Sequence, residues 1–193
     1  MDILIVAVTL PLTVPILAVL FVLAGRDGGP AFFGHERVGQ NGVKFKCWKV
    51  RSMVANSQTV LREHLRDNPA AAAEWARDYK LTDDPRITRF GRFIRKTSLD
   101  ELPQIINVVK GDMSIVGPRP IVADELKKYG SSARSYLAQR PGITGLWQVS
   151  GRNSVSYTER VALDVEYGLN RSLALDIAII GKTFLAILLR TGR

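Results

Sequence analysis

The sequence has very few residues of the types that build disulfide frameworks or zinc clusters. Among 193 residues it contains one cysteine, Cys47, and two histidines, His35 and His64. A single cysteine excludes an internal disulfide framework, and so few thiol and imidazole groups exclude a zinc cluster. Basic residues are also missing from the first 24 positions, where Asp2 is the one charged residue. The composition of the remainder is typical of a cytosolic domain that follows a segment of different character.

The charge of the remainder is strongly positive. The chain has 27 lysines and arginines against 18 acidic residues, which gives a net charge of +9. Such a balance favours anionic partners, including nucleic acid, acidic lipid headgroups and phosphorylated small molecules. The apolar N-terminus and the lack of a recognised nucleic-acid-binding motif argue against nucleic acid.

Residues 3–24 form an apolar run that is interrupted in character only by two threonines and two prolines. At ~1.5 Å rise per residue this length covers the ~30 Å of a bilayer's hydrocarbon core. Pro15 removes a backbone donor and clashes with the carbonyl of Pro11, which predicts a bend near the midpoint. A bent helix either returns to the side it entered from or crosses the bilayer, and both topologies stay open. The basic residues after Ala24 place the C-terminal end in the cytoplasm, and no signal-peptide pattern is present.

Beyond the turn at residues 27–30, local patterns predict mainly helices. They are polar helical structure over 56–80, a short apolar helix over 102–109, and an apolar segment over 173–189 that is interfacial or packed on the core. A short strand is predicted over 43–50. Glycine-rich loops are predicted over 111–120 and 139–153.

Residues 87–96 form an amphipathic helix by pattern. Arginines recur at every third position from Arg86 to Arg95, with apolar residues largely between them. Such a helix either lies in a membrane interface with its arginines toward headgroups or packs on a soluble core with a basic edge.

The tetrapeptide Asp100-Glu101-Leu102-Pro103 is typical of a helix start, with Asp100 as the N-cap. Arg95 and Lys96 just upstream favour the ionised carboxylate. An ionised and partly desolvated aspartate is a competent nucleophile toward phosphorus. Glu101 can hold Mg²⁺ while substrate phosphates fill the other positions. The structural and the catalytic interpretations are compatible.

Three other segments carry groups suited to phosphate or nucleotide. Prolines on both sides of Arg119 restrict the backbone that presents it. Lys49 and Arg51 fall on the same side of the predicted strand. Residues 144–153 mix glycines, an aromatic ring, amides and an arginine, as nucleotide-binding loops do. Each pattern is also common in ordinary surface loops and solvent-facing strands.

At these residues the sequence resembles the bacterial sugar transferase family, the monotopic phosphoglycosyl transferases that begin the assembly of surface glycans. The most specific stretch is residues 86–120, with further agreement over 32–53, 140–153 and around Asp164, Tyr167 and Asp176. Within the family the chain is most similar to exopolysaccharide-priming members that use galactose or glucose phosphate.

The resemblance implies an α-rich α/β fold with minor β structure. It implies a re-entrant membrane helix over residues 1–25, kinked at Pro15, and a small catalytic domain over 26–193 with interfacial amphipathic helices. The implied location is the cytoplasmic face of the bacterial inner membrane, in contact with membrane lipids.

The resemblance also implies a reaction. A sugar-1-phosphate would pass from a UDP-sugar to undecaprenyl phosphate with release of UMP, through a covalent intermediate on Asp100. Glu101 with Asp100 would hold the Mg²⁺ cofactor. The substrate-binding residues would be Lys49, Arg95 and Arg119 around the diphosphate, with Gln148 and Arg152 near the nucleotide.

The sequence departs from the family pattern in the N-terminal helix. Val14 precedes Pro15 where many relatives have serine, and no basic residue precedes Asp2. Larger members of the family carry a further N-terminal region, so this chain is either a complete protein or part of one. The oligomeric state, a homodimer included, is open. The alternative function is a non-catalytic, membrane-anchored basic module that binds acidic lipids.

Overall fold

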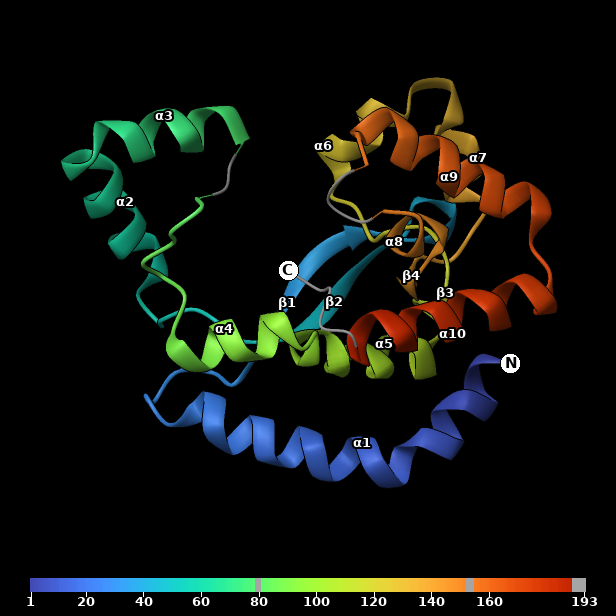
Figure 1. The fold of residues 1–193 in the computed structure, drawn as a ribbon, viewed down its shortest axis with the longest axis horizontal. Coiled ribbons are helices and arrows are strands. Elements are labelled where there is room, and N and C mark those ends of the chain that lie inside the picture. Colours follow the sequence, from blue (N-terminus) through green and yellow to red (C-terminus); the bar gives the residue numbers. More distant parts are fainter. Residues whose placement is uncertain (79–80, 152–154, 189–193) are drawn as a thin grey trace.

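The computed structural model describes residues 1–78, 81–151 and 155–188, in which helices surround two small sheets (Figure 1). The longer helices are α1 (Asp2–Gly25), α2 (Ser57–Asp67), α3 (Pro69–Asp78), α4 (Arg89–Lys96), α9 (Tyr157–Asn170) and α10 (Leu173–Leu188). The short α-helices are α5 (Ile105–Lys110), α6 (Ala123–Leu126), α7 (Ala133–Leu137) and α8 (Leu146–Val149). The 3₁₀ helices are η1 (Gln40–Gly42), η2 (Leu99–Gln104) and η3 (Lys127–Ser132). The strands are β1 (Phe32–Val38), β2 (Lys44–Val50), β3 (Ser114–Val116) and β4 (Gly142–Thr144). The expected α-rich fold with minor β structure is confirmed.

Helix α1 lies lengthwise against the rest of the molecule. It is one continuous helix with Pro11 and Pro15 inside it, and Figure 1 shows it running below a row formed by α4, α5 and α10. A single stripe of its residues is buried, namely Val6, Thr13, Leu20 and Ala24. The first part of the stripe packs with Phe45, Cys47, Val108 and Met113, and the last part packs with Ala31, Val50 and Ile94. The helix therefore contributes to two core clusters along its length.

Both ends of α1 are hydrogen-bonded to the same body. At the N-terminal end, Asp2 Oδ1 accepts from Ser114 Oγ at 3.1 Å and from the Ile115 amide at 3.4 Å. At the C-terminal end, Arg51 Nη2 donates to the Ala24 carbonyl at 2.6 Å and Nε to the Pro30 carbonyl at 2.7 Å. The ends of this apolar helix thus meet polar groups of the folded domain on one side.

The outward face of α1 is apolar. Its exposed large side chains include Ile3, Leu4, Val8, Leu12, Val19, Phe21 and Val22. By length and composition α1 can cross a membrane, and it is the one helix of the described residues that can. Neighbouring helices add the exposed apolar residues Phe93 of α4, Ile106 and Val109 of α5, and Leu173, Ile177, Phe184, Leu185 and Ile187 of α10. So many exposed apolar side chains on adjacent helices mark an interaction surface rather than a water-facing one.

The predicted strand over 43–50 is confirmed as β2, and the structure supplies its partner. Strand β1 pairs with it antiparallel, with Phe32 opposite Val50 and Val38 opposite Lys44. The polar helical region over 56–80 is confirmed through residue 78 as α2 and α3, which project as an arm at the upper left of Figure 1. Residues 79–80 lie outside the described part.

Two segments expected to be loops contain regular structure, so that expectation is wrong. Within 111–120, β3 pairs parallel with β4, which lies within 139–153 and is followed by α8. The two backbones approach so closely that a Cβ on Gly117 would lie 2.4 Å from the Arg140 carbonyl oxygen. The strands are three residues each and pair only with each other, so neither segment carries a local strand pattern.

The helices around the predicted catalytic pair also differ in detail. Helix α4 begins at Arg89 because the Thr88 hydroxyl accepts from the Gly91 amide at 2.8 Å. The predicted helix over 102–109 divides between η2 and α5. Asp100 is not an N-cap, because Ser98 holds that position in the left-handed region with φ of 57°.

The arginines from Arg86 to Arg95 do not all face outward, as an interfacial helix would require. Arg86 is buried in an ion pair with Asp84, with 2.6 Å between Nη2 and Oδ2. Arg95 is partly buried and donates to Ser52. The exposed face of α4 carries Arg89, Arg92 and Lys96 together with Phe93, which suits contact with both headgroups and acyl chains.

Helix α4 docks on the chain that follows β2 through a glycine. A Cβ built on Gly91 would lie 1.8 Å from the Ser52 carbonyl oxygen, a backbone atom that cannot swing aside. We therefore expect Gly91→Ala to destabilise the fold by about 1–3 kcal/mol, the usual cost of overpacking. The measurement is thermal unfolding in detergent. The matched control is Gly181→Ala in α10, where an added Cβ meets nothing within 4 Å; an equal loss in both variants contradicts the docking argument.

Helix α9 carries a buried carboxyl group. Asp164 is 2% exposed, and its Oδ2 accepts from the Tyr129 hydroxyl at 2.7 Å. Burial raises the pKa of Asp164 to about 7, while Tyr129, Arg160 and Arg119 oppose the shift. Because the pKa lies above its ordinary value, the protonated folded form is favoured.

The contribution of Asp164 to the free energy of unfolding should therefore fall as the pH rises from about 4 to about 7. Above that range Asp164 should contribute no further change. Asp164→Asn keeps an oxygen acceptor for Tyr129 but cannot ionise. We expect the melting temperature of this variant to depend less steeply on pH than that of the wild type in this window. Parallel curves for the two proteins would refute the assignment.

Candidate functional site

The predicted catalytic pair lies where η2 docks on β2. A left-handed turn at Ser98 ends α4 and starts η2, which places Asp100 and Glu101 in its first turn. Lys49, next to last in β2, extends its Nζ to within 2.8 Å of Glu101 Oε1. Both side chains are partly buried, so the contact is shielded from bulk water. The structure thus brings three of the predicted site residues together.

Asp100 is in an electrostatically mixed environment. Burial raises the pKa of its carboxyl to about 6, and Glu101 adds to the rise, whereas Lys49 and Arg95 favour the charged form. Desolvation outweighs the basic neighbours that were predicted to favour the ionised form, so the pKa lies above its ordinary value. A pKa of about 6 still leaves the carboxylate the major form at pH 7, and desolvation makes it a stronger nucleophile.

Arg95 reaches the pair from α4. Its Nε donates to Ser52 Oγ at 2.8 Å, which fixes the guanidinium two residues beyond the end of β2. Burial lowers the pKa of Arg95, and the nearby Asp100 counteracts this by favouring the charged form. Arg95 is thereby held as a cation beside Asp100.

Arg51 is not part of this group, contrary to the same-side prediction for Lys49 and Arg51. The strand ends at Val50, so alternation no longer applies one residue later. The Arg51 guanidinium instead pairs with Asp27 and donates to carbonyls at the end of α1 and at Pro30. Arg51 thereby connects the C-terminal end of α1 to the end of β2.

Arg119 comes from the turn after β3. Its guanidinium carbon lies 5.5 Å from the centroid of the Trp147 ring, and Arg160 packs against the same ring at 4.4 Å. The indole of α8 therefore lies near two cations, and cation–π interaction with its ring stabilises both. The Arg119 backbone amide also hydrogen-bonds Asp164, which anchors the turn to α9.

A small cavity joins these groups. It has a volume of about 40 Å³ and is lined by Lys49, Glu101, Arg119 and Gln148 of the predicted set, together with Arg37, Cys47, Gln104, Pro120, Gly142, Ile143 and Trp147. Gln148 Nε2 donates to the Ile143 carbonyl at 3.0 Å, which fixes the amide. Arg152 lies outside the described residues. The cavity is smaller than the roughly 300–1,000 Å³ of typical ligand sites, so it can hold only part of such a ligand.

Sequence reasoning missed Arg37, the second arginine of the cavity. It lies in β1, near Arg119, with its Nη1 3.8 Å from Glu125 Oε2. Burial, with Arg119 next in importance, lowers the pKa of Arg37. Arg37 lies in segment 32–53, which resembles the family, and this was the one sequence signal that could have pointed to it. The strand pairing that places Arg37 near Arg119 joins distant parts of the chain and has no local pattern. Cys47 is also buried here, and burial raises the pKa of its thiol, which favours the protonated form.

The adjacent carboxylates of Asp100 and Glu101 fit Mg²⁺ better than a metal enclosed by protein alone. The described residues contain no group of three acidic, histidine or cysteine side chains that could hold a metal. Mg²⁺ commonly uses one or two carboxylates and takes its other ligands from water and substrate phosphates. Basic groups around two carboxylates can then hold a phosphorylated substrate for attack by Asp100.

Comparisons with known proteins identify relatives of this chain. The chain is 58% identical over 178 residues to the undecaprenyl-phosphate galactose phosphotransferase of Salmonella typhimurium, covering 92% of this chain and 37% of that protein. It is 58% identical to the UDP-galactose-lipid carrier transferase of Erwinia amylovora, covering 94% of this chain and 38% of the relative. It is 50% identical to the exopolysaccharide production protein ExoY of Rhizobium meliloti, covering 99% of this chain and 85% of the relative.

The chain thus spans less than two fifths of the length of the first two relatives and most of the third. The sequence profile of the family described as bacterial sugar transferase matches residues 1–190, nearly the whole chain. The protein belongs to the bacterial sugar transferase family.

Proposed function

We propose that this chain transfers a hexose-1-phosphate, of galactose or glucose, from a UDP-sugar to undecaprenyl phosphate and releases UMP. The reaction would be the first membrane step of exopolysaccharide or another surface glycan, at the cytoplasmic face of the bacterial inner membrane. The observation that carries the proposal is the partly buried Asp100 beside the Lys49–Glu101 ion pair, in a molecule with an apolar helix along one side.

The reaction proceeds in two displacements. An Asp100 carboxylate oxygen attacks the sugar-linked phosphorus, the bond from that phosphorus to the bridging oxygen breaks, and UMP leaves with that oxygen. An oxygen of the lipid phosphate then attacks the same phosphorus, and the Asp100 carboxylate leaves. The products are undecaprenyl diphosphate sugar, UMP and the free enzyme, so atoms and charges balance.

The chain's own residues position and neutralise the phosphates. Lys49 and Arg95 both act on Asp100 and balance the charge that accumulates on the phosphoryl oxygens. Arg119 and Arg37 line the adjoining cavity and would receive the leaving phosphate. Mg²⁺ held by Glu101 and Asp100 would supply further positive charge at the diphosphate.

We also propose that α1 is re-entrant. Its lengthwise packing and the hydrogen bonds at Asp2 and Ala24 support a helix whose two ends face the same aqueous side. A spanning helix would have to break one of these end contacts, because only one end can remain beside the domain. The exposed apolar faces of α4, α5 and α10 would lie at the membrane surface around it.

A non-catalytic lipid-binding module is the second candidate, favoured by the exposed mixture of arginine and phenylalanine on α4. It gives no reason for a partly buried carboxylate beside two cations, which costs desolvation free energy in a protein that needs only surface charge. The two candidates differ in what Asp100→Asn does.

We expect Asp100→Asn to reduce turnover by at least about 1,000-fold, because the amide cannot attack phosphorus, a loss comparable to removal of other catalytic nucleophiles. The measurement is UMP release from UDP-galactose with undecaprenyl phosphate and Mg²⁺. Asp124→Asn, an exposed carboxylate in α6, is the control and should remain active. Membrane insertion should be unchanged in both, and near-normal turnover by Asp100→Asn would eliminate Asp100 as the nucleophile.

A covalent intermediate on Asp100 predicts that UMP is released before the lipid acceptor binds. Without the lipid acceptor the wild type should release at most about one UMP per active site, since the aspartyl intermediate then waits for an acceptor. Strictly sequential kinetics, with no UMP until the lipid is added, would indicate direct displacement instead.

The re-entrant topology predicts that both ends of α1 are protected in intact cells. Single cysteines at positions 2 and 27, in a Cys47→Ser background, are treated with a membrane-impermeant thiol reagent. Protection at both positions that is lost on permeabilisation is the expected result. Labelling of position 2 alone in intact cells would establish a spanning helix.

A further inference from the structure

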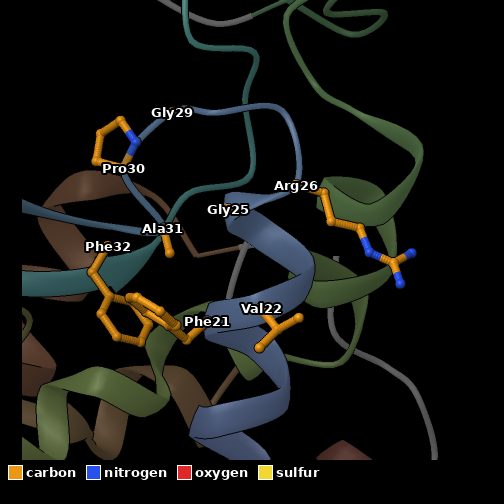
Figure 2. Close-up of a pocket in the computed structure, with 8 residues that line it drawn as sticks. All are labelled: Phe21, Val22, Gly25, Arg26, Gly29, Pro30, Ala31 and Phe32. Atoms are coloured by element: carbon orange, nitrogen blue, oxygen red, sulfur yellow. The ribbon is translucent and has the colours of Figure 1, made fainter.

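A wide groove lies where α1 ends and the chain turns back into β1. It has a volume of about 530 Å³, within the roughly 300–1,000 Å³ of typical ligand sites. Its lining residues are Phe21, Val22, Gly25, Arg26, Gly29, Pro30, Ala31 and Phe32 (Figure 2). All the side chains among them are apolar except that of Arg26. None of these residues belongs to the predicted substrate-binding set.

The groove depends on small residues and a fixed turn. A Cβ built on Gly25 would meet nothing within 4 Å, so the space beside it is open because this residue lacks a side chain. Arg51 fixes the turn by donating to the Ala24 and Pro30 carbonyls and pairing with Asp27. The walls are therefore in place before any ligand arrives, which lowers the entropic cost of binding.

One side of the groove continues into the apolar face of α1. Phe21 and Val22 are 56% and 61% exposed. Figure 2 shows the Phe21 ring beside that of Phe32 on β1, with 5.7 Å between ring centroids. A chain in the surrounding bilayer can thus enter between α1 and β1 without crossing a polar barrier.

Two lining residues of the groove pack in the same hydrophobic cluster as residues next to the catalytic pair. Ala31 is a buried member, and Phe32 a flanking member, of the cluster that also receives Leu99 and Leu102. These two leucines flank Asp100 and Glu101 in η2. Lining residues of the groove and residues next to the catalytic pair consequently belong to one hydrophobic cluster.

Arg26 gives the groove a polar edge. It is exposed, and no ion pair engages it within the described residues, while its side chain in Figure 2 extends away from Pro30 and Ala31. An apolar groove with one uncompensated cation matches a ligand with a long apolar chain and an anionic head.

We propose that this groove binds the isoprenoid units next to the phosphate of the polyprenyl phosphate acceptor, with Arg26 drawing in the anionic head. The inference rests on the proposed function and adds a place for its lipid substrate. Open space beside Gly25 accommodates the branched chain, and Phe21 and Phe32 form an aromatic wall against it. The shared packing of Ala31 and Phe32 with the leucines of η2 favours the reacting lipid over a bulk phospholipid, because only the acceptor must deliver its phosphate to Asp100.

The test is Gly25→Leu, which adds a side chain to the groove from the last residue of α1, where an added Cβ meets nothing within 4 Å. We expect the KM for undecaprenyl phosphate to rise about three- to tenfold; the change is moderate because the displaced chain returns to an equally apolar bilayer. The lipid-independent release of UMP should be unchanged, since that half-reaction uses no acceptor. Gly181→Leu in α10 adds the same side chain at another open position and should leave both quantities at wild-type values.

The possible results separate the groove from the reaction itself. An unaltered KM for undecaprenyl phosphate in a folded Gly25→Leu protein would refute the proposal that the groove binds the acceptor. An equal rise in Gly181→Leu would refute it as well. A photoreactive polyprenyl phosphate should label groove peptides, and loss of that label to excess phospholipid, but not to unlabelled polyprenyl phosphate, would assign the groove to bulk lipid. A wild type that forms no undecaprenyl diphosphate sugar would instead refute the proposed function.

Discussion

Gly91 lies against the Ser52 carbonyl, and this close approach decides where the next ten residues of the chain fall. With α4 docked there, Arg95 reaches Ser52 Oγ, and the left-handed turn at Ser98 directs η2 back onto β2. Lys49 then meets Glu101, and Asp100 is left desolvated beside two cations. A side chain at position 91 would separate the elements that supply these groups. The site therefore depends on a contact that carries no charge and no chemistry of its own.

The packing of α1 bears on how the proposed site would receive one lipid substrate and one water-soluble substrate. The helix gives one stripe of side chains to the core and leaves the rest of its surface apolar and exposed. The same core clusters contain Val50 and Ile94, which lie next to the segments that hold the site. A lipid-bound substrate approaching along α1 and a soluble nucleotide sugar approaching from the basic cavity would then meet at η2. Arg51 connects the two regions, because it fastens the end of α1 to the residue that follows β2.

The basic groups of the site are held by different kinds of contact. Lys49 is held by an ion pair, Arg95 by a hydroxyl acceptor, and Arg119 by stacking and by its backbone bond to Asp164. Only the first of these neutralises its cation with a carboxylate. The others remain available as positive charge for phosphoryl oxygens, whose own charge compensates the cost of their burial.

The sequence by itself determined the candidate residues of the site and the helix-rich class of the fold. The Asp100-Glu101-Leu102-Pro103 tetrapeptide, the prolines around Arg119 and the apolar run with Pro15 are local signals, which depend on residues close together in the chain. They identified the long apolar helix and the candidate catalytic residues, and the local pattern over 43–50 identified the strand that contains Lys49. Tertiary structure decided what depends on contacts between distant segments. The β3–β4 pairing through Gly117, the arrival of Arg37 beside Arg119 and the diversion of Arg51 toward α1 have no local pattern. The raised pKa of Asp100 is likewise decided by the tertiary structure, because desolvation depends on everything that packs around a residue and not on its neighbours in the chain.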